Sequence, residues 1–301
     1  MEKFDYIIIG AGIVGLSIGR RLVEQKLGSV CIVEKEPTLG VHASGRNSGV
    51  LHAGIYYSSD SLKAKFCKEG AKALGEYAIK KNIPYLKTGK VIVAHNQETT
   101  HTLETLFERA LKNGVNVKKI TRSELKEIEP MADTFDWALL SPDTAIIDSK
   151  KVLAHLKQDF TNLGGSIKYN SMALEVDSDK KQIQINGRIL GYECLINAAG
   201  NYADRIAHQM GVASHLKLLP FKGVYWKLAD NFSKSVNGAI YPAPDIKMPF
   251  LGVHITRGID GKVLLGPTAI PALGRENYHA FSGLNFNESS KMFYYLAKNV
   301  D

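Results

Sequence analysis

The sequence predicts an α/β fold in which one domain, with a parallel sheet, is interleaved with a second, α+β domain built on a mostly antiparallel sheet. The first observation is that residues 1–34 read as strand, helix and strand, the order of a βαβ unit. The second is that the chain leaves this pattern, returns to a helix followed by strands near residue 148, and becomes strand-rich again beyond residue 216. This alternation predicts two discontinuous domains, 1–84 with 145–218 and 85–144 with 219–301.

Composition permits two such domains and excludes several classes of protein. The chain has 301 residues, 45% of them hydrophobic and 23% charged, which is ordinary for a globular protein and excludes wholesale disorder. Its 38 Lys and Arg exceed its 30 Asp and Glu, but they are dispersed without an Arg-rich run, so no nucleic-acid partner is expected. The three cysteines are far apart, and no apolar run reaches the ~20 residues of a membrane span. We therefore expect a cytoplasmic protein.

The βαβ unit carries a dinucleotide-binding motif. Phe4–Ile9 is an apolar strand, and Gly10-Ala11-Gly12-Ile13-Val14-Gly15 follows it and opens a helix predicted over Ile13–Gln25. In such a G-x-G-x-x-G turn the glycines permit a tight turn, close approach of a pyrophosphate and close packing of helix on strand. Glu34 ends the second strand, Ser29–Glu34, where an acidic side chain accepts the ribose hydroxyls of an adenosine. The first domain is therefore predicted to be Rossmann-like, and Glu34 argues against NADP.

A long polar loop is predicted between residues 36 and 61. Its donors and glycines suit a pyrophosphate or a substrate carboxylate, which makes the following residues candidate ligands: Ser44, Arg46, Asn47, Ser48 and Gly49. His52 lies in the same loop, although a lone histidine is more often a hydrogen-bonded structural residue than a chemical one.

The remaining elements follow from periodicity and turn residues. Helices are predicted over Leu62–Lys80, Glu98–Asn113, Asp148–Asn162 and Asn201–Met210. Strands are predicted over 90–94, 166–169, 173–177, 182–185, 193–197, 223–227, 250–256 and 262–265. Asn186-Gly187 is a hairpin signal. The strand at 195–197 ends in small residues, so Ala199 and Gly200 offer either a second close approach to a cofactor or a junction that needs glycine for its geometry.

Taken in order, several segments resemble one family. They are GAGIVGL, SGRNSGVLHAGIYY, SLKAKFCKEG, IIDSKKVL, LINAAGNYADRIA, PFKGVYW and IYPAPDIKMPFLGVHITRGIDGKVLLGP. Together they resemble the FAD-dependent D-amino-acid-oxidase/glycerol-3-phosphate-dehydrogenase superfamily. Within it, HAGIYY and FLGVHIT are most similar to the L-2-hydroxyglutarate oxidase/dehydrogenase branch. The resemblance covers nearly the whole chain.

The resemblance implies FAD as the cofactor, with its ADP half at Gly10–Gly15 and Glu34. It places the Ser44–Ser48 loop near the pyrophosphate and His52–Tyr56 near the isoalloxazine, and Lys35 and Val176 complete the expected cofactor residues. The substrate is then expected on a sheet of the second domain.

The resemblance also gives the later polar residues a role. A 2-hydroxy dicarboxylate needs cationic or donor groups for each buried carboxylate, and the candidates are Tyr56, Lys222, Tyr225, Tyr241, His254 and Arg257. Without the resemblance, Lys222 and Arg257 read as surface residues of solvated strands. Hydride transfer from C2 to flavin N5 needs a base for the hydroxyl proton, and the candidates are His52 and His254, with His52 favoured because its loop is expected to face the flavin. No metal is expected.

Alternatives remain open from the sequence. Members of the family continue past the point where this sequence stops, with a glycine-rich turn and a final helix that complete the flavin site. The chain is therefore expected to be either part of a longer product or a shortened protein, with the C-terminal end of its substrate domain missing. Competing functions are a flavin amine or amino-acid oxidase, a glycerol-3-phosphate dehydrogenase relative, and a non-catalytic flavin-binding fragment. Quinone or oxygen is the expected electron acceptor, and peripheral contact with the inner membrane is a further expectation.

Overall fold

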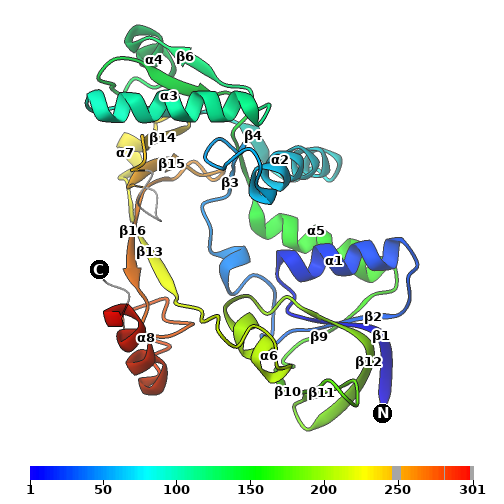
Figure 1. Ribbon diagram of the computed structural model, residues 1–301. Helices are drawn as coiled ribbons and strands as arrows, with labels where there is room; N and C mark the ends of the chain where they lie inside the picture. The colour runs from blue at the N-terminus through cyan, green and yellow to red at the C-terminus, as the bar shows by residue number, and fades with distance from the viewer. Residues whose placement is uncertain (246–251, 281, 299–301) are drawn as a thin grey trace. The chain divides into compact units, whose positions relative to one another are not determined.

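The computed structural model describes residues 1–245, 252–280 and 282–298 (Figure 1). The chain divides into two compact units made of segments that are distant in sequence. Unit 1 comprises Met1–Asn47, Ser149–Lys222 and Pro271–Asp301, and unit 2 comprises Ser48–Asp148 and Gly223–Ile270. The mixed α/β fold with several sheets is as the sequence predicted. Within the described ranges, no helix has both the length and the apolar character needed to cross a membrane.

Unit 1 contains a six-stranded sheet in the order β10-β11-β12-β1-β2-β9. Its strands are β1 (Glu2–Ile9), β2 (Val30–Val33), β9 (Ser166–Lys168), β10 (Ala173–Asp177), β11 (Gln182–Ile185) and β12 (Arg188–Asn197). The pairs β12–β1, β1–β2 and β2–β9 are parallel, whereas β10–β11 and β11–β12 are antiparallel. The hairpin at Asn186-Gly187 is confirmed, with φ values of 41° and 76° that a two-residue turn of this kind requires.

Helices pack on both faces of the unit 1 sheet. On one face, α1 (Ile13–Glu24) and α5 (Ser149–Asn162) lie side by side (Figure 1). Gly19 permits this packing, because a Cβ there would lie 3.1 Å from the side chains of Ile32 and Phe160. On the other face, α6 (Ala203–Gln209) adds Ile206 to a core that includes the side chains of Ile7, Ile9, Cys31 and Val33. Unit 1 also contains η1 (Ala43–Gly45), η2 (Gly200–Tyr202) and α8 (Phe286–Lys298).

Unit 2 is built on a seven-stranded sheet in the order β13-β16-β15-β14-β5-β7-β6. Its strands are β5 (Lys90–Val93), β6 (Lys118–Ile120), β7 (Ala138–Ser141), β13 (Phe221–Lys227), β14 (Ala239–Pro242), β15 (His254–Arg257) and β16 (Val263–Pro271). The pairs β14–β15, β15–β16, β5–β7 and β6–β7 are antiparallel, and β14–β5 is parallel. A smaller sheet, β3-β8-β4, joins β3 (Val50–Leu51), β8 (Ala145–Ile147) and β4 (Tyr85–Lys87).

Alternation along the strands of unit 2 separates two cores. Ile92 of β5 and Tyr241 of β14 point to the face where α3 (Gln97–Lys112) packs through buried leucines. Val91 and Ile240 point to the opposite face, with Leu125 of α4 (Arg122–Ile128). Unit 2 also contains α2 (Leu62–Lys80) and α7 (Asp230–Ser233). The face that carries Tyr241 is the one on which the histidines described below lie.

The compact units differ from the predicted domains in four segments, 48–84, 145–148, 219–222 and 271–298. Residues 48–84 lie in unit 2, because β3 and β4 both pair with β8 of that unit. Residues 271–298 lie in unit 1, because Arg275 binds Asp204 and Glu276 binds Lys35. Both of these placements depend on contacts between residues far apart in the sequence, which local patterns do not reveal.

Candidate active site

The glycine loop between β1 and α1 brings the end of a strand against the start of a helix. Gly10 has φ +104°, and a Cβ on it would lie 2.5 Å from the carbonyl oxygen of Ala198. A Cβ on Gly15 would lie 1.9 Å from the carbonyl oxygen of Gly10. Glycine is therefore required at both positions, because only glycine lets the end of β1 and the start of α1 come this close.

Two side chains hold this loop in place. Glu34 accepts the Ala11 amide at 2.8 Å on one carboxylate oxygen and the Glu36 amide at 3.0 Å on the other. Ser44 Oγ accepts the Ile13 amide at 3.0 Å. Each carboxylate oxygen of Glu34 keeps a second lone pair, so the same group can still accept a hydroxyl from a ligand.

A cavity of about 310 Å³ lies beside the loop in unit 1. It is lined by ten of the predicted cofactor residues: Gly10, Ala11, Gly12, Ile13, Val14, Glu34, Lys35, Ser44, Ala199 and Gly200. Gly15 does not line it but packs behind the loop.

Five other predicted cofactor residues do not line this cavity either. Val176 is buried in the core with Ile206, so its side chain serves packing. The Arg46 guanidinium lies 4.2 Å from the ring centroid of Tyr278, and Asn47 donates to the backbone of Ala43 and Ser44. The last two belong to unit 2: Ser48 and Gly49.

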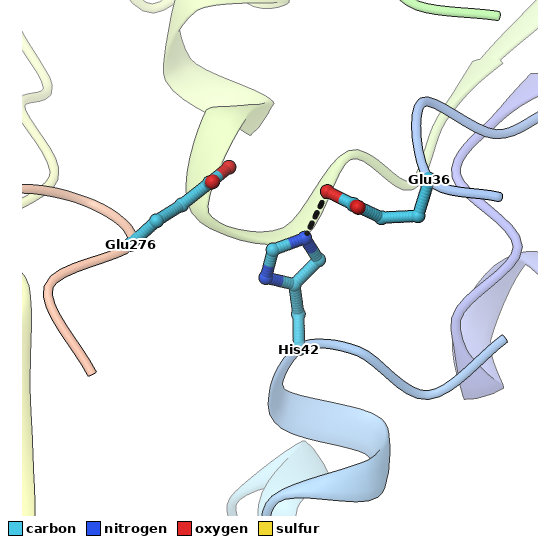
Figure 2. A group of neighbouring side chains, drawn as sticks. All are labelled: Glu36, His42 and Glu276. Carbon is cyan, nitrogen blue, oxygen red and sulfur yellow. Dashed lines mark hydrogen bonds and ion pairs between the residues drawn. The ribbon is translucent and has the colours of Figure 1, made fainter. Parts of the chain in front are cut away.

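Sequence reasoning missed a charged cluster at the edge of the cavity. Lys35 Nζ lies 2.7 Å from His42 Nε2, 2.6 Å from Glu276 Oε1 and in contact with Glu36 Oε1. Figure 2 shows the His42 ring between the two carboxyl groups, with its bond to Glu36. The three potential metal ligands, Glu36, His42 and Glu276, lie within 4.8 Å of one another, but the Lys35 ammonium already supplies their shared cation.

The electrostatics of this cluster favour the ion pairs. Burial alone would lower the pKa of Lys35, but hydrogen bonds to Glu276 and Glu36 raise it. His42 Nδ1 also contacts the Tyr278 hydroxyl at 2.7 Å. Because Glu276 and Tyr278 come from the segment after β16, only the folded chain brings them to Lys35, and no local motif could have indicated them.

A second group of predicted residues gathers in unit 2. The ring of Tyr241 stacks on His254 with centroids 3.9 Å apart, and it meets the ring of His52 edge-on at 6.2 Å. His254 Nδ1 donates to the Gly252 carbonyl at 2.9 Å, which leaves Nε2 as the acceptor of a neutral ring. The fold thus places both candidate bases, His52 and His254, against the ring of Tyr241.

Burial keeps both imidazoles uncharged near neutral pH. Burial, together with the positive Lys90, lowers the pKa of His52 to about 3. Burial also lowers the pKa of His254, against the raising effect of its hydrogen bond to Gly252. Two buried polar atoms in this group have no hydrogen-bond partner in the described part of the chain, namely His52 Nδ1 and the Tyr56 hydroxyl.

The other predicted substrate residues lie apart from the histidines. Arg257 alternates to the opposite face of β15 and donates to the carbonyls of Ser233 and Val236, so its role in the structure is to hold backbone. Lys222 belongs to unit 1 and donates to Asn277 at 2.8 Å. Tyr225 lies on β13 and is 40% exposed. Only Tyr56, Tyr241 and His254 of the predicted substrate set join the group around His52.

Comparison with known proteins places this geometry among flavoenzymes. The family model described as FAD dependent oxidoreductase matches residues 5–295. The chain is 38% identical to the mitochondrial L-2-hydroxyglutarate dehydrogenase of Pongo abelii and 40% identical to that of Homo sapiens, in each case over 93% of the chain. It is 40% identical to the L-2-hydroxyglutarate dehydrogenase of Indibacter alkaliphilus over 95% of the chain. The chain spans 70%, 64% and 72% of the lengths of these three relatives.

Solved structures share the fold. The L-alpha-glycerophosphate oxidase of Mycoplasma pneumoniae with FAD bound has a TM-score of 0.78 and 25% identity, covering 94% of this chain and 76% of that one. The L-proline dehydrogenase of P. horikoshii has a TM-score of 0.79 and 19% identity, covering 99% and 77% of the two chains.

Proposed function

Since the chain belongs to the FAD dependent oxidoreductase family, we propose that it oxidises L-2-hydroxyglutarate, or a similar L-2-hydroxy acid, to the 2-oxo acid. The observation that carries the proposal is 38–40% identity over more than nine-tenths of the chain to relatives with this name. A buried group of two histidines and two tyrosines in unit 2 supports it, because the oxidation of an alcohol needs a base.

The residues of unit 1 fit FAD. Gly10 and Gly15 let β1 and α1 approach closely, and this packing sets the first residues of α1 at the cavity, where the positive end of the helix dipole would face a pyrophosphate. Glu34 would accept the ribose hydroxyls with the lone pairs that its two amide bonds leave free. When bound, the flavin accepts the hydride from C2 of the hydroxy acid.

The histidines of unit 2 would take the hydroxyl proton. Both rings are neutral near pH 7, the form that accepts a proton. The bond from His254 Nδ1 to Gly252 fixes the tautomer and leaves Nε2 to act as the base. We assign the base to one of these two imidazoles and Tyr56 and Tyr241 to substrate contact, whereas Lys222, Tyr225 and Arg257 are no longer proposed as ligands.

The proposed function also includes an electron acceptor and a place in the cell. Reduced flavin would be reoxidised by quinone or oxygen, and a peripheral contact with a membrane surface would serve the quinone. All three cysteines are free, which supports a reducing compartment such as the cytoplasm. The relatives of Pongo abelii and Homo sapiens are named as mitochondrial, and the one of Indibacter alkaliphilus carries no compartment in its name.

Anaerobic bleaching of the flavin tests the substrate class. The purified chain, reconstituted with FAD, is mixed with L-2-hydroxyglutarate, D-2-hydroxyglutarate, L-lactate, glycine, L-proline or glycerol 3-phosphate, and the loss of flavin absorbance is followed. We expect L-2-hydroxyglutarate to bleach it fastest. Faster bleaching by an amino acid or by glycerol 3-phosphate would replace the proposal with an amino-acid oxidase or a glycerophosphate-oxidising enzyme. A chain that cannot be reconstituted with FAD would instead be a non-catalytic fragment.

Replacement of the two histidines tests the base. Removing the base is expected to slow flavin reduction roughly 10²-fold or more, so either His52→Ala or His254→Ala should show this loss while still binding flavin. The assignment fails if both variants bind flavin normally and are each reduced at the full rate. His101→Ala, on the exposed side of α3, is the matched control and should keep the wild-type rate.

A further inference from the structure

Lys90 is a buried cation that the proposed mechanism does not yet use. It begins β5, and alternation along that strand places it on the same face as Ile92, where Tyr241 and the histidines lie. Backbone pairing with Ala239 of β14 and Ser141 of β7 fixes it in the middle of the sheet. The residue is 1% exposed. A lysine so deeply buried is uncommon unless something compensates its charge.

Aromatic rings surround the ammonium, but no carboxylate does. Lys90 Nζ lies 4.5 Å from the ring centroid of Tyr56 and 5.0 Å from that of Tyr241. Within the described residues, no Asp or Glu forms an ion pair with it. Cation–π contacts of this kind contribute less than the cost of burying a charge without a counter-ion.

Lys119, in the same sheet, shows how a lysine beside aromatic rings is usually neutralised, namely by a carboxylate of the same chain. Its Nζ also lies over two rings, 4.8 Å from the centroids of Phe107 and Trp137. It differs in being 2.6 Å from Glu104 Oε2 and in being partly exposed. Lys119 therefore has a carboxylate of the chain as its counter-ion, whereas Lys90 contacts two aromatic rings and has no carboxylate beside it among the described residues.

Two side chains beside Lys90 each carry a polar atom that has no hydrogen-bond partner within the described residues. The Tyr56 hydroxyl and His52 Nδ1 are buried polar atoms that can donate a hydrogen bond, and the Tyr56 ring lies beside the Lys90 ammonium. A carboxylate oxygen accepts from an ammonium, a phenol and an imidazole N–H alike. We propose that Lys90 binds a carboxylate of the substrate, with the Tyr56 hydroxyl and His52 beside it.

This assignment rests on the proposed function and deepens it. It gives the site a cation in place of Arg257 and Lys222, which the structure commits to other partners. The substrate's anion would restore the charge balance that the chain leaves open, so binding would be selective for acids over alcohols and neutral amino compounds.

Equilibrium binding of glutarate tests the inference without requiring turnover. Glutarate has the two carboxylates of 2-hydroxyglutarate but no hydroxyl to oxidise, and its binding to the FAD-loaded protein is measured by calorimetry at pH 7. Lys90→Met fills the same volume without charge and is expected to weaken binding roughly 30-fold or more, as removal of one partner of a buried charge pair does. Lys119→Met is the matched control and should change it less than about 2-fold.

The pH dependence of wild-type binding provides a second measurement that needs no variant. Burial lowers the pKa of Lys90 to about 7. Of the groups that face it, His52 and His254 are already neutral there, and Cys67, Tyr56 and Tyr241 have raised pKa values. Glutarate stays fully ionised, so its affinity is expected to fall about 10-fold or more from pH 7 to pH 9.

The outcomes separate the two proposals. If the wild-type protein binds no glutarate and is bleached by none of the hydroxy acids, the proposed function fails. If it binds glutarate and a correctly folded, yellow Lys90→Met binds equally well, or if wild-type affinity is unchanged up to pH 9, only the assignment of Lys90 is overturned. In the supported case, KM for L-2-hydroxyglutarate rises in Lys90→Met more than kcat falls.

Discussion

The carbonyl oxygen of Gly10 leaves room for a hydrogen atom at Gly15 but not for a methyl group. Gly15→Ala is therefore expected to push α1 away from β1 and to lose flavin, seen as a fall in the 450-to-280 nm absorbance ratio and a lower Tm. Gly70→Ala in α2 is the control, because a Cβ there meets nothing within 4 Å. That change should stabilise the protein by about 0.5–1 kcal/mol. A Gly15→Ala protein with full flavin content would contradict the role given to the close contact.

Lys90 also makes a prediction about stability. Its pKa is lowered by burial to about 7 in the folded protein, against about 10.4 when unfolded. Between these values the unfolded chain holds a proton that the folded chain has released, so stability rises with pH across this window. Denaturant unfolding from pH 7 to pH 10 should show wild type gaining stability relative to Lys90→Met. Parallel curves for the two proteins would show that Lys90 keeps its proton in both states.

For single residues, the sequence could predict a role only where the residues that define it are neighbours along the chain. The glycine motif and Glu34 stand within one βαβ unit, and their place at the cavity follows from that unit alone. Lys90 reads as an ordinary surface lysine, because its burial depends on β14, which lies about 150 residues further along the chain. Residue type alone suggested Arg257 as a ligand, because it does not show which face of a strand a side chain occupies or that Arg257 donates to backbone carbonyls.

Among the elements, the segment after β16 is held to the rest of unit 1 by ion pairs and hydrogen bonds of its side chains. Arg275 makes a two-pronged ion pair with Asp204 at 2.6 and 2.9 Å, and both side chains are 11% exposed. Although burial alone would raise it, the bonds from Arg275 and from the Leu218 amide hold the pKa of Asp204 below its usual range. Asn201 ties the same segment through the backbone of Arg275.

Arg275→Met is expected to loosen this segment, because it leaves Asp204 buried without its partner. The cost should be about 2–4 kcal/mol, measured by urea unfolding. Limited proteolysis should then cut within residues 271–298 before it cuts elsewhere. Arg122→Met, which removes an exposed pair with Asp133, is the control and should cost less than about 1 kcal/mol. Equal proteolysis of the two variants would show that other contacts hold the segment.

Element bounds were predictable where caps and periodicity are local. Helix α2, which Ser61 caps, occupies the predicted residues Leu62–Lys80, and α5 ends at Asn162 as predicted. Six short strands were not predicted, because two to four residues carry too little pattern without their partners: β3, β4, β6, β7, β8 and β14. Of the strand predicted over 250–256, residues 250 and 251 lie outside the described residues, and β15 covers His254–Arg257.

For the molecule as a whole, the chain passes between the two units at residues 47/48, 148/149, 222/223 and 270/271. Neither unit is a continuous stretch, so each core is completed only when distant segments have met. The sequence pattern indicates interleaved domains, whereas the exact bounds of each compact unit depend on these distant contacts. Contacts of such long range also predict slow folding relative to a helical protein of the same length.

The two edges of the unit 2 sheet differ in a way that matters for handling the protein. At one edge, β6 carries Lys118 and Lys119, whose charges discourage the addition of another strand. At the other, β13 exposes Val224 by 41% and Trp226 by 74%, and within the described residues no strand covers its outer side. Two copies can therefore extend one sheet through β13, and the chain is expected to self-associate as its concentration rises.

Light scattering across a concentration series measures this association. Trp226→Lys gives β13 the kind of guard that β6 already has, and we expect it to keep the protein monomeric where wild type forms larger species. Phe135→Lys is the control: this side chain is exposed and lies outside β13, so the variant should associate like wild type. Trp137 is not used for this purpose, because its ring contacts Lys119. If β13 pairs between copies, the concentration at which this pairing begins is the upper limit for purifying, storing and assaying the chain as a monomer.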